Sequence, residues 1–418
     1  MVRKAKVLLI ILVAILLLFT ALVIGVMRRH SEELDAYLRD YAALDRYRNI
    51  TITDRSGTLI YDGSFSDDTV TRLSTFHIVG DQNGSLPSSI LAKELDKPVE
   101  ISSLNGYQPS QTELQLTIDL PLQNGAYTLL QNHGCNGAII VMDYTTGELL
   151  TMVSTPSVDV LEADTFEAGA FLCKATTAYP PGSTMKAVTA AAVLEKNGAA
   201  AKTFTYYCTG ADGYARCYQT TAHGEQHLDS ILSHSCNCGT GAIARTMLLP
   251  EELNRCAQNT HLLDADIIRD FDCQPGNIDA NDDLTWSAIG QSTDLVTPVG
   301  MCAFYSSVAN GGIMVSPHLF SDTETEQTRI MRPDTAQYIS GALIPVAAGT
   351  DVGCTAFGKT GSAEVEGADA HSWFVCSLTD ENAPTYTIAV FLENGGGAYY
   401  AKLLLAEFTN LYILGGGN

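Results

Sequence analysis

The chain opens with a long apolar run. Val7 to Met27 comprises 21 residues without a charged side chain, and basic residues flank the run on both sides. A helix of about 20 apolar residues can span a bilayer, whereas a cleaved signal peptide has a shorter apolar core and a small-residue cleavage site. We therefore predict a cytoplasmic tail at 1–6 and a retained transmembrane anchor at 7–27. Three basic residues before the run and two after it favour a cytoplasmic N-terminus only slightly.

Beyond the anchor the pattern is mixed. Apolar residues first recur at helical spacing, at Leu34, Tyr37, Leu38, Tyr41 and Leu44. This spacing indicates either an amphipathic helix or a continuation of the anchor helix. From Ile50 to about Gln111 short apolar runs stand among Ser, Asp, Asn and Gly, and residues 51–61 are typical of two strands about a tight turn. We expect a small, loop-rich membrane-proximal module over residues 28–110.

Longer strand and helix patterns define a main domain at 111–418. A short strand and a helix are predicted first, at 114–119 and 122–130, and helical character dominates from Ser183 to about Gln258. Strand patterns stand on either side of this helical region, with a hairpin before it at 137–142 and 148–153, and three strands after it at 356–361, 372–378 and 386–392, followed by a terminal helix at 399–414. This order implies one sheet completed from both ends of the domain, with a helical lobe inserted.

Composition and charge narrow the range of partners. Hydrophobic residues make up 46% of the 418 residues, which is enough for a large core. After residue 30 there are 19 Lys and Arg against 47 Asp and Glu, a net charge of −28. Nucleic acids and anionic lipid surfaces are therefore poor partners for this portion, and we expect no nucleic-acid partner.

The eleven cysteines predict no metal site. None lies in a Cys-x-x-Cys pair with nearby histidines, and the spacing of Cys236 and Cys238 is too short for a zinc knuckle. We expect no cofactor. Cys208 and Cys217 flank a turn-like stretch and could face each other, so either a disulfide or two free thiols is compatible with their spacing.

The candidate chemistry centres on Ser183. Pro180, Pro181 and Gly182 end an irregular segment, and a run of strong helix formers begins directly after them. Lys186 lies one turn after Ser183 on the same helix face, so its amine can approach the Ser183 hydroxyl. A helix that is apolar on nearly every face is buried, and burial lowers the pKa of an amine. The pair is therefore a candidate nucleophile and base.

Two further short motifs follow in the chain. Ser235 and Asn237 form a Ser-x-Asn motif about fifty residues after Ser183, and Lys359, Thr360, Gly361 and Ser362 end a predicted strand. Each motif is weak alone, because both occur often in turns and caps. In the order Ser-x-x-Lys, Ser-x-Asn, Lys-Thr-Gly, they resemble the constellation of the penicillin-interacting serine acyltransferases.

Additional segments resemble class B penicillin-binding proteins. They are Thr53-Asp54-Arg55-Ser56-Gly57, Leu116-Thr117-Ile118-Asp119, Thr146-Gly147-Glu148-Leu149-Leu150, Tyr179-Pro180-Pro181-Gly182-Ser183, Ile289-Gly290-Gln291 and Ala309-Asn310-Gly311-Gly312. The similarity covers residues 50–418. It implies the mixed α+β and α/β fold of serine β-lactamases and transpeptidases, with a five-stranded antiparallel sheet. It also implies a monofunctional peptidoglycan D,D-transpeptidase whose N-terminus is cytoplasmic and whose catalytic domain lies outside the membrane.

The resemblance and the residue types together assign roles. Ser183 would attack the D-Ala-D-Ala carbonyl of a stem peptide, or a β-lactam, while Lys186 takes its proton and an acyl-enzyme forms. Ser235 would pass a proton to the leaving nitrogen, and Asn237 would bind the substrate amide. Substrate carboxylate binding falls to the charge of Lys359 and to the strand-end residues Thr360, Gly361 and Ser362. Backbone N–H groups of Ser183 and Ser362 would form the oxyanion hole.

Other functions of the same fold stay open. They are a D,D-carboxypeptidase, a β-lactamase, and a catalytically silent scaffold of a wall-synthesis complex. The segment from Pro250 to Asn254 superficially resembles the Glu-x-x-x-Asn loop of class A β-lactamases, but a proline occupies the position of the required glutamate. Two departures from the family stand out, a short membrane-proximal module and Cys173-Lys174 where relatives have an Asn-Arg pair. The family implies a membrane glycosyltransferase as partner.

Overall fold

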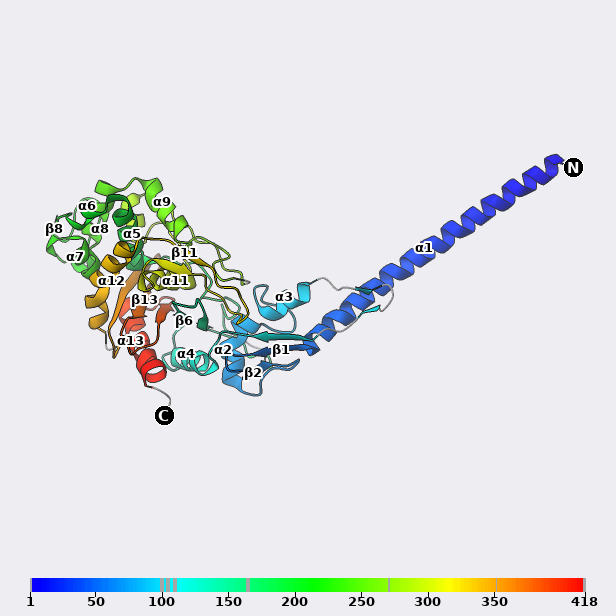
Figure 1. Ribbon diagram of the computed structural model, residues 1–418, viewed down its shortest axis with the longest axis horizontal. Coiled ribbons are helices and arrows are strands. Elements are labelled where there is room, and N and C mark those ends of the chain that lie inside the picture. The colour runs from blue at the N-terminus through cyan, green and yellow to red at the C-terminus, as the bar shows by residue number, and fades with distance from the viewer. Residues whose placement is uncertain are drawn as a thin grey trace.

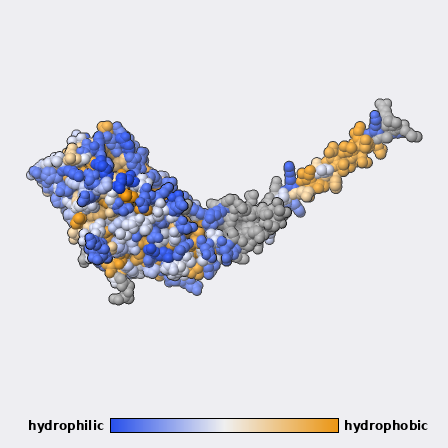
Figure 2. Space-filling model, viewed as in Figure 1, coloured by the Kyte–Doolittle hydropathy of each residue, from blue (hydrophilic) through white to orange (hydrophobic). Residues whose placement is uncertain are grey.

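A single long helix carries the apolar run. The computed structural model describes residues 2–97, 101–102, 106–107, 111–162, 166–269, 271–350 and 352–415. Helix α1 (Val2–Arg48) is continuous and projects away from the rest of the molecule (Figure 1). Within the described residues, the segment Lys6–Ser31 of this helix is the one long and apolar enough to cross a membrane, and Figure 2 shows its hydrophobic surface. The anchor therefore continues directly into the helix that the spacing after residue 30 indicated.

A three-stranded sheet follows the helix. Strands β1 (Ile50–Thr53) and β2 (Leu59–Tyr61) pair antiparallel around a turn, as predicted, and Asp54 Oδ1 accepts the backbone N–H groups of Ser56 and Thr58 at 2.9 and 2.8 Å. Strand β5 (Thr112–Gln115) pairs parallel to β1, so the small sheet includes a strand from beyond the expected boundary at residue 110. This sheet therefore does not mark a division at residue 110, and the division into a module at 28–110 and a domain at 111–418 stays a prediction.

The small module also contains helices that the pattern did not predict. These elements are α2 (Thr69–Val79), α3 (Ile90–Asp96) and a short hairpin of β3 (Ile101–Ser102) and β4 (Gly106–Tyr107). Helix α2 packs against α4 (Leu120–Asn132) and β7 of the main domain. Its buried Arg72 forms an ion pair with Asp159 at 2.8 Å, which ties the module to the loop after β7.

The central sheet has five antiparallel strands. Its order is β12 (Ala356–Val365), β13 (Ala368–Leu378), β14 (Tyr386–Leu392), β6 (Gly137–Asp143), β7 (Leu149–Ser154). Two strands come from the start of the domain and three from its end, which confirms the predicted sheet.

Both faces of this sheet are covered. Along β13, Trp373 and Val375 face one hydrophobic core, whereas Phe374 and Cys376 face the other. Helix α11 (Pro298–Ala309) packs on the first face, and α13 (Ala398–Phe408) with α4 packs on the second (Figure 1). The terminal helix continues beyond α13 as a π-helical segment at Thr409–Leu414.

The helical lobe is inserted between β7 and β12. It contains α5 (Met185–Asn197), α6 (Ala199–Lys202), α7 (Leu228–Ser233), α8 (Asn237–Met247), α9 (Pro250–Asn259), α10 (Leu284–Ala288) and α12 (Pro333–Ala348), with a peripheral hairpin of β10 (Ile313–Val315) and β11 (Gln327–Arg329). The predicted helical run from Ser183 to Gln258 is wrong between α6 and α7. There the chain forms a hairpin of β8 (Tyr206–Cys208) and β9 (Gly224–Gln226), joined by a long turn.

Two glycines allow a close backbone contact beside Ser183. The Gly182 N–H donates to the Gly290 carbonyl at 2.8 Å, and Gly290 has a φ of +75°. A Cβ at Gly290 would lie 2.2 Å from the Gly182 carbonyl oxygen, far inside van der Waals contact. The loop after α10 therefore presses directly on the turn that carries Ser183.

Substituting Gly290→Ala should displace this turn. We expect labelling of Ser183 by a fluorescent penicillin to slow by about 10²-fold, because a nucleophile misplaced by roughly 1 Å loses about that much rate. Stopped-flow or gel labelling at several times measures the effect. Gly367→Ala is the matched control, since Gly367 has a φ of +76° but no atom within 4 Å of the added Cβ. Equal labelling of the two variants would show that the Gly182 contact does not position the serine.

Candidate active site

Ser183 lies at the start of a buried helix and faces a cleft. It is the middle residue of a 3-10 turn (Gly182–Thr184) that continues into α5, and its side chain is half-buried. The cleft has a volume of about 760 Å³, and its lining includes Ser183, Ser235, Asn237, Thr360 and Ser362. The structure thus brings residues from all three predicted motifs to one cavity.

The Ser235 hydroxyl is where the two predicted lysines meet. Ser235 lies between α7 and α8 with a φ of +53°. Lys186 Nζ donates to Ser235 Oγ at 3.0 Å, to the Ser235 carbonyl at 2.6 Å and to Asn237 Oδ1 at 2.6 Å. Lys359 Nζ donates to the same Ser235 Oγ at 3.0 Å and to the Thr360 carbonyl at 2.9 Å. One hydroxyl therefore joins α5, the α7–α8 loop and β12.

The contact between Lys186 and Ser183 differs from the expectation. In the part of the chain that the structure describes, the hydrogen bonds of Lys186 go to Ser235 and Asn237, and none goes to Ser183. Three acceptors around one amine suit an ammonium group, which has three donors. To act as a base, Lys186 must lose a proton and turn its lone pair toward Ser183. Catalytic hydrogen bonds often form only when substrate is bound.

Burial lowers the pKa of both lysines. Lys186 is 1% exposed and Lys359 is 0% exposed. Burial lowers the pKa of Lys186 to about 7. It also lowers the pKa of Lys359 well below the usual value for lysine, and the nearby charge of Lys186 lowers it further. Two cations on one hydroxyl repel each other, so the pair carries less than its full double charge near neutral pH.

The position of Lys359 corrects one prediction. The sequence pattern predicts a strand at 356–361, which would place Lys359 near the end of that strand. Strand β12 instead continues to Val365, and Lys359 is buried in it opposite Val375 of β13. The exposed fraction of the side chain is therefore nearly the same for Lys359 and Lys186. The residues of this strand that line the cleft are Thr360, Ser362 and Glu364.

Strand β12 lies against the turn that carries Ser183. A Cβ at Gly361 would lie 2.8 Å from the Pro181 carbonyl oxygen, and a Cβ at Gly182 would lie 2.7 Å from the Ser362 carbonyl oxygen. Gly361 thus serves close packing. The Ser362 hydroxyl accepts the Ala398 N–H at the start of α13 at 3.0 Å, which leaves its own proton available for an anion in the cleft.

A cluster of cysteines lies directly behind Ser235 and Asn237. Cys208 and Cys217 approach to 3.7 Å between their Sγ atoms, but both are free thiols, so the pairing left open by their spacing is not a disulfide here. Cys236 and Cys238 each also lie 3.7 Å from the Cys217 sulfur. Cys208 ends β8, Cys217 lies in the turn that follows, and Cys236 and Cys238 lie at the start of α8. None of them has a Cys-x-x-Cys spacing, and for this reason the sequence pattern missed the cluster.

Lys174, at the position where relatives carry arginine, is a buried structural residue. It is 2% exposed, and its amine forms an ion pair with Glu393 Oε2 at 2.9 Å. Its neighbour Cys173 contacts the Ser154 hydroxyl through its sulfur at 3.6 Å. The two residues therefore join the segment before Ser183 to the ends of β14 and β7.

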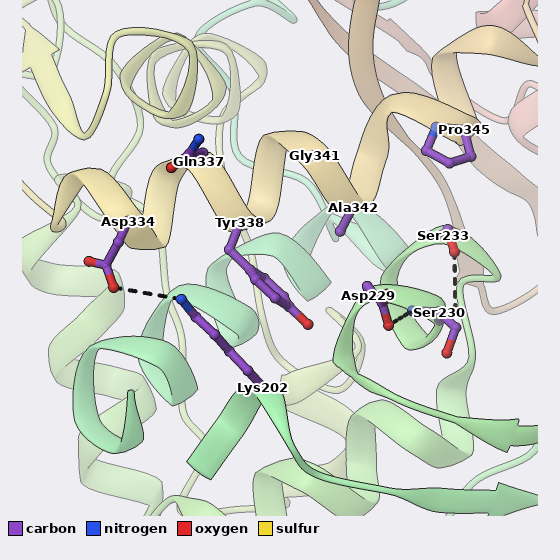
Figure 3. Close-up of a pocket in the computed structure, with 10 residues that line it drawn as sticks. All are labelled: Lys202, Asp229, Ser230, Ser233, Asp334, Gln337, Tyr338, Gly341, Ala342 and Pro345. Atoms are coloured by element: carbon purple, nitrogen blue, oxygen red, sulfur yellow. Dashed lines mark hydrogen bonds and ion pairs between the residues drawn. The ribbon is translucent and has the colours of Figure 1, made fainter. Parts of the chain in front are cut away.

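A separate pocket of about 510 Å³ lies among residues of α6, α7 and α12 (Figure 3). Lys202 reaches Asp334 Oδ2 at 3.7 Å and also lies over the Tyr338 ring. Asp229 accepts the Ser230 N–H at 2.8 Å. None of the predicted catalytic residues is among the residues that line this pocket, whereas Ser183, Ser235 and Asn237 line the other cleft.

Comparisons with known proteins agree with this geometry. A family model described as "Penicillin binding protein transpeptidase domain" matches residues 137–411. The peptidoglycan D,D-transpeptidase PbpA of Mycobacterium tuberculosis (strain H37Rv) is 26% identical over 361 residues, which covers 71% of this chain and 72% of PbpA. The peptidoglycan D,D-transpeptidase MrdA of Escherichia coli K12 is 24% identical over 385 residues, which covers 73% of this chain and 58% of MrdA.

Solved structures share the fold. The crystal structure of PBPA from Mycobacterium tuberculosis superposes with a TM-score of 0.73 at 20% identity, covering 87% of this chain and 99% of that one. The D,D-transpeptidase domain of a peptidoglycan glycosyltransferase from Eggerthella lenta has a TM-score of 0.66 at 21% identity, with coverage of 89% and 99%. The sheet and the inserted helical lobe are therefore those of known transpeptidase domains.

The lowered pKa of Lys186 predicts a pH dependence. A base needs an unprotonated amine, so the second-order rate constant for acylation of Ser183 by a β-lactam should rise with pH through about 7 and level off above it. Stopped-flow acylation between pH 5.5 and about 9 measures this profile. Lys186→Arg keeps a cation but removes the base, so it should lower the rate by about 10²–10⁴-fold and abolish the rising limb. An unchanged limb in this variant would mean that another group is the base.

Proposed function

Because the chain belongs to the family of penicillin-binding protein transpeptidase domains, we propose that Ser183 is its acylated nucleophile. The protein is a class B penicillin-binding protein, a serine-type peptidoglycan D,D-transpeptidase. One observation carries the assignment of residues. Lys186, Ser235, Asn237 and Lys359 form a single hydrogen-bonded group, and its members Ser235 and Asn237 line the same cleft as Ser183.

Acylation uses the groups around Ser183. The Ser183 oxygen attacks the carbonyl between the two terminal D-alanines of a stem peptide, and its proton passes to the neutral Lys186 amine. Ser235 bonds to both lysines, so its hydroxyl can transfer a proton to the leaving nitrogen as D-alanine departs. Backbone N–H groups of Ser183 and Ser362 stabilise the oxyanion, the first at a helix N-terminus. The product is an ester on Ser183.

The substrate carboxylate binds along β12. Thr360 and Ser362 present hydroxyls to the cleft, while Lys359 lies buried behind them and donates to the Thr360 carbonyl. Lys359 therefore acts through Ser235 and, when it is protonated, through its positive potential, in a chain whose net charge is −23. Gly361 allows the strand to approach the nucleophile's turn. Asn237, held by Lys186 at 2.6 Å, is placed to bind the substrate amide.

Transfer to a second stem peptide completes the reaction. An amine of a neighbouring stem attacks the Ser183 ester and forms the cross-link, whereas β-lactams acylate the same serine and leave slowly. The segment that superficially resembles a β-lactamase loop supports acyl transfer over rapid hydrolysis. Glu252 caps α9 by accepting the Leu249 N–H at 2.7 Å and pairs with Lys196, so this carboxylate is committed to the helix.

The membrane anchor suggests the setting of this reaction. We propose that the N-terminus of α1 is cytoplasmic and that the domain at 111–418 acts outside the membrane, where peptidoglycan stems lie. A complex of PBP2 with MreC from Helicobacter pylori and a peptidoglycan synthase complex are known for related folds. By analogy, a membrane glycosyltransferase is the partner we propose for α1 and the module at 28–110.

Mass spectrometry tests the assignment. The full-length protein treated with penicillin should carry one adduct, on the peptide that contains Ser183, and Ser183→Ala should carry none. Ser340→Ala, which alters a serine outside the cleft on α12, should label like the wild type. An adduct on another peptide, or none at saturating drug in a folded protein, would contradict the role of Ser183.

A further inference from the structure

Four potential metal ligands converge behind the Ser235–Asn237 motif. Cys208 ends β8, Cys217 lies in the long turn of the hairpin, His223 precedes β9, and Cys236 caps the N-terminus of α8. Their sulfur and ring-nitrogen atoms all lie within 4.8 Å of one another. The three cysteines are buried and the histidine is half-buried. Such a closed set of soft ligands is typical of structural zinc sites.

The distances suit a tetrahedral ion. Zinc about 2.3 Å from each sulfur and about 2.0–2.1 Å from a nitrogen would hold sulfurs about 3.8 Å apart and a sulfur and a nitrogen about 3.6 Å apart. Cys217 Sγ lies 3.7 Å from the sulfurs of Cys208 and Cys236, and Cys208 Sγ lies 3.5 Å from His223 Nδ1. A disulfide would instead need a pair at about 2.05 Å.

Groups around the ligands favour metal-bound thiolates. The backbone N–H groups of Gly239 and Gly210 donate to the sulfurs of Cys236 and Cys208 at 3.2 and 3.4 Å. Such outer hydrogen bonds orient the ligands of metal sites and stabilise their charge. The His223 ring stacks on His234 with 5.7 Å between centroids and 9° between planes, which fixes its direction.

Cys238 stands outside the set. Its thiol donates to the Ala215 carbonyl at 3.3 Å, although its sulfur also lies 3.7 Å from Cys217. A thiol that donates its proton to a carbonyl is not a thiolate ligand. The geometry thus selects three of the four clustered cysteines.

We propose that Cys208, Cys217, His223 and Cys236 bind one structural zinc ion, which fastens the β8–β9 hairpin to the Ser235–Asn237 motif. Cys236 is the residue between Ser235 and Asn237. Asn237 Nδ2 donates to the Arg216 carbonyl at 2.8 Å, and Arg216 is the neighbour of Cys217. The ion would therefore fix the positions of Ser235 and Asn237, the two residues whose side chains accept hydrogen bonds from Lys186.

Metal content of the full-length protein tests this site. The reduced wild type, purified in detergent and dialysed against trace zinc, should contain one zinc ion per chain by mass spectrometry of the metal. Cobalt added to the stripped protein should give the intense visible bands of a tetrahedral ion and thiolate-to-cobalt charge transfer. Cys217→Ala should lose both signals. Cys302→Ala is the matched control, a buried cysteine in α11, and together with Cys238→Ala it should retain them.

Several results would overturn the site. They are a folded wild type that takes up neither zinc nor cobalt, equal metal content in Cys217→Ala, and a Cys208–Cys217 disulfide found by mass mapping in place of free thiols. If Cys217→Ala does not fold, the cobalt spectrum of the wild type decides. Stripping the metal should also slow acylation of Ser183 by about tenfold. This last readout rests on the proposed function, whereas metal content does not, so the two failures are distinguishable.

Discussion

Two buried lysines that donate to one serine hydroxyl are the constraint on which the site depends. Moving an ammonium group from water into a protein interior costs several kcal/mol even after relaxation. Here Lys186 and Lys359 meet at Ser235 Oγ, each at 3.0 Å, and neither is more than 1% exposed. Only elements that cannot move apart maintain such an arrangement. Helix α5 is buried over residues 185–194, β12 is paired with β13 along its length, and the α7–α8 loop holds Ser235 at a positive φ.

The central sheet was predictable and the helices of the small module were not, for a common reason. Alternating or continuous apolar runs marked β6, β7, β13 and β14, because both faces of this sheet are buried. Helix α2 buries mainly polar residues, among them Arg72, Ser74 and His77. Their partners, Asp159, Asn124 and the Ala170 carbonyl, lie some 50 to 93 residues away. A local sequence pattern cannot predict a helix whose buried polar side chains bond to residues far away in the sequence.

Motif order predicted the candidate catalytic residues but not the groups that surround them. Local spacing placed Lys186 near Ser183, yet its observed partners come from a loop 49 and 51 residues further on. Lys359 looked like a strand end because Gly361 follows it, whereas pairing with β13 continues the strand to Val365. The sequence pattern did not reveal the cysteine cluster, because spacing rules apply to ligands that lie close together in the sequence. The β8–β9 hairpin and the N-cap of α8 bring three sulfurs and the His223 ring together only in three dimensions.

The unbroken helix α1 has a mechanical consequence. Helix rises about 1.5 Å per residue, so the part of α1 after Ser31 extends about 26 Å beyond the apolar segment. A flexible tether would let the cleft sample many heights above the bilayer, but a rigid rod sets one height and one orientation. The enzyme would then reach only the part of the wall that lies at this height, and any tilt of the anchor in the membrane would move the cleft sideways. Lengthening the rod by one residue would both lift the cleft and turn it by about 100°, since a helix has about 3.6 residues per turn.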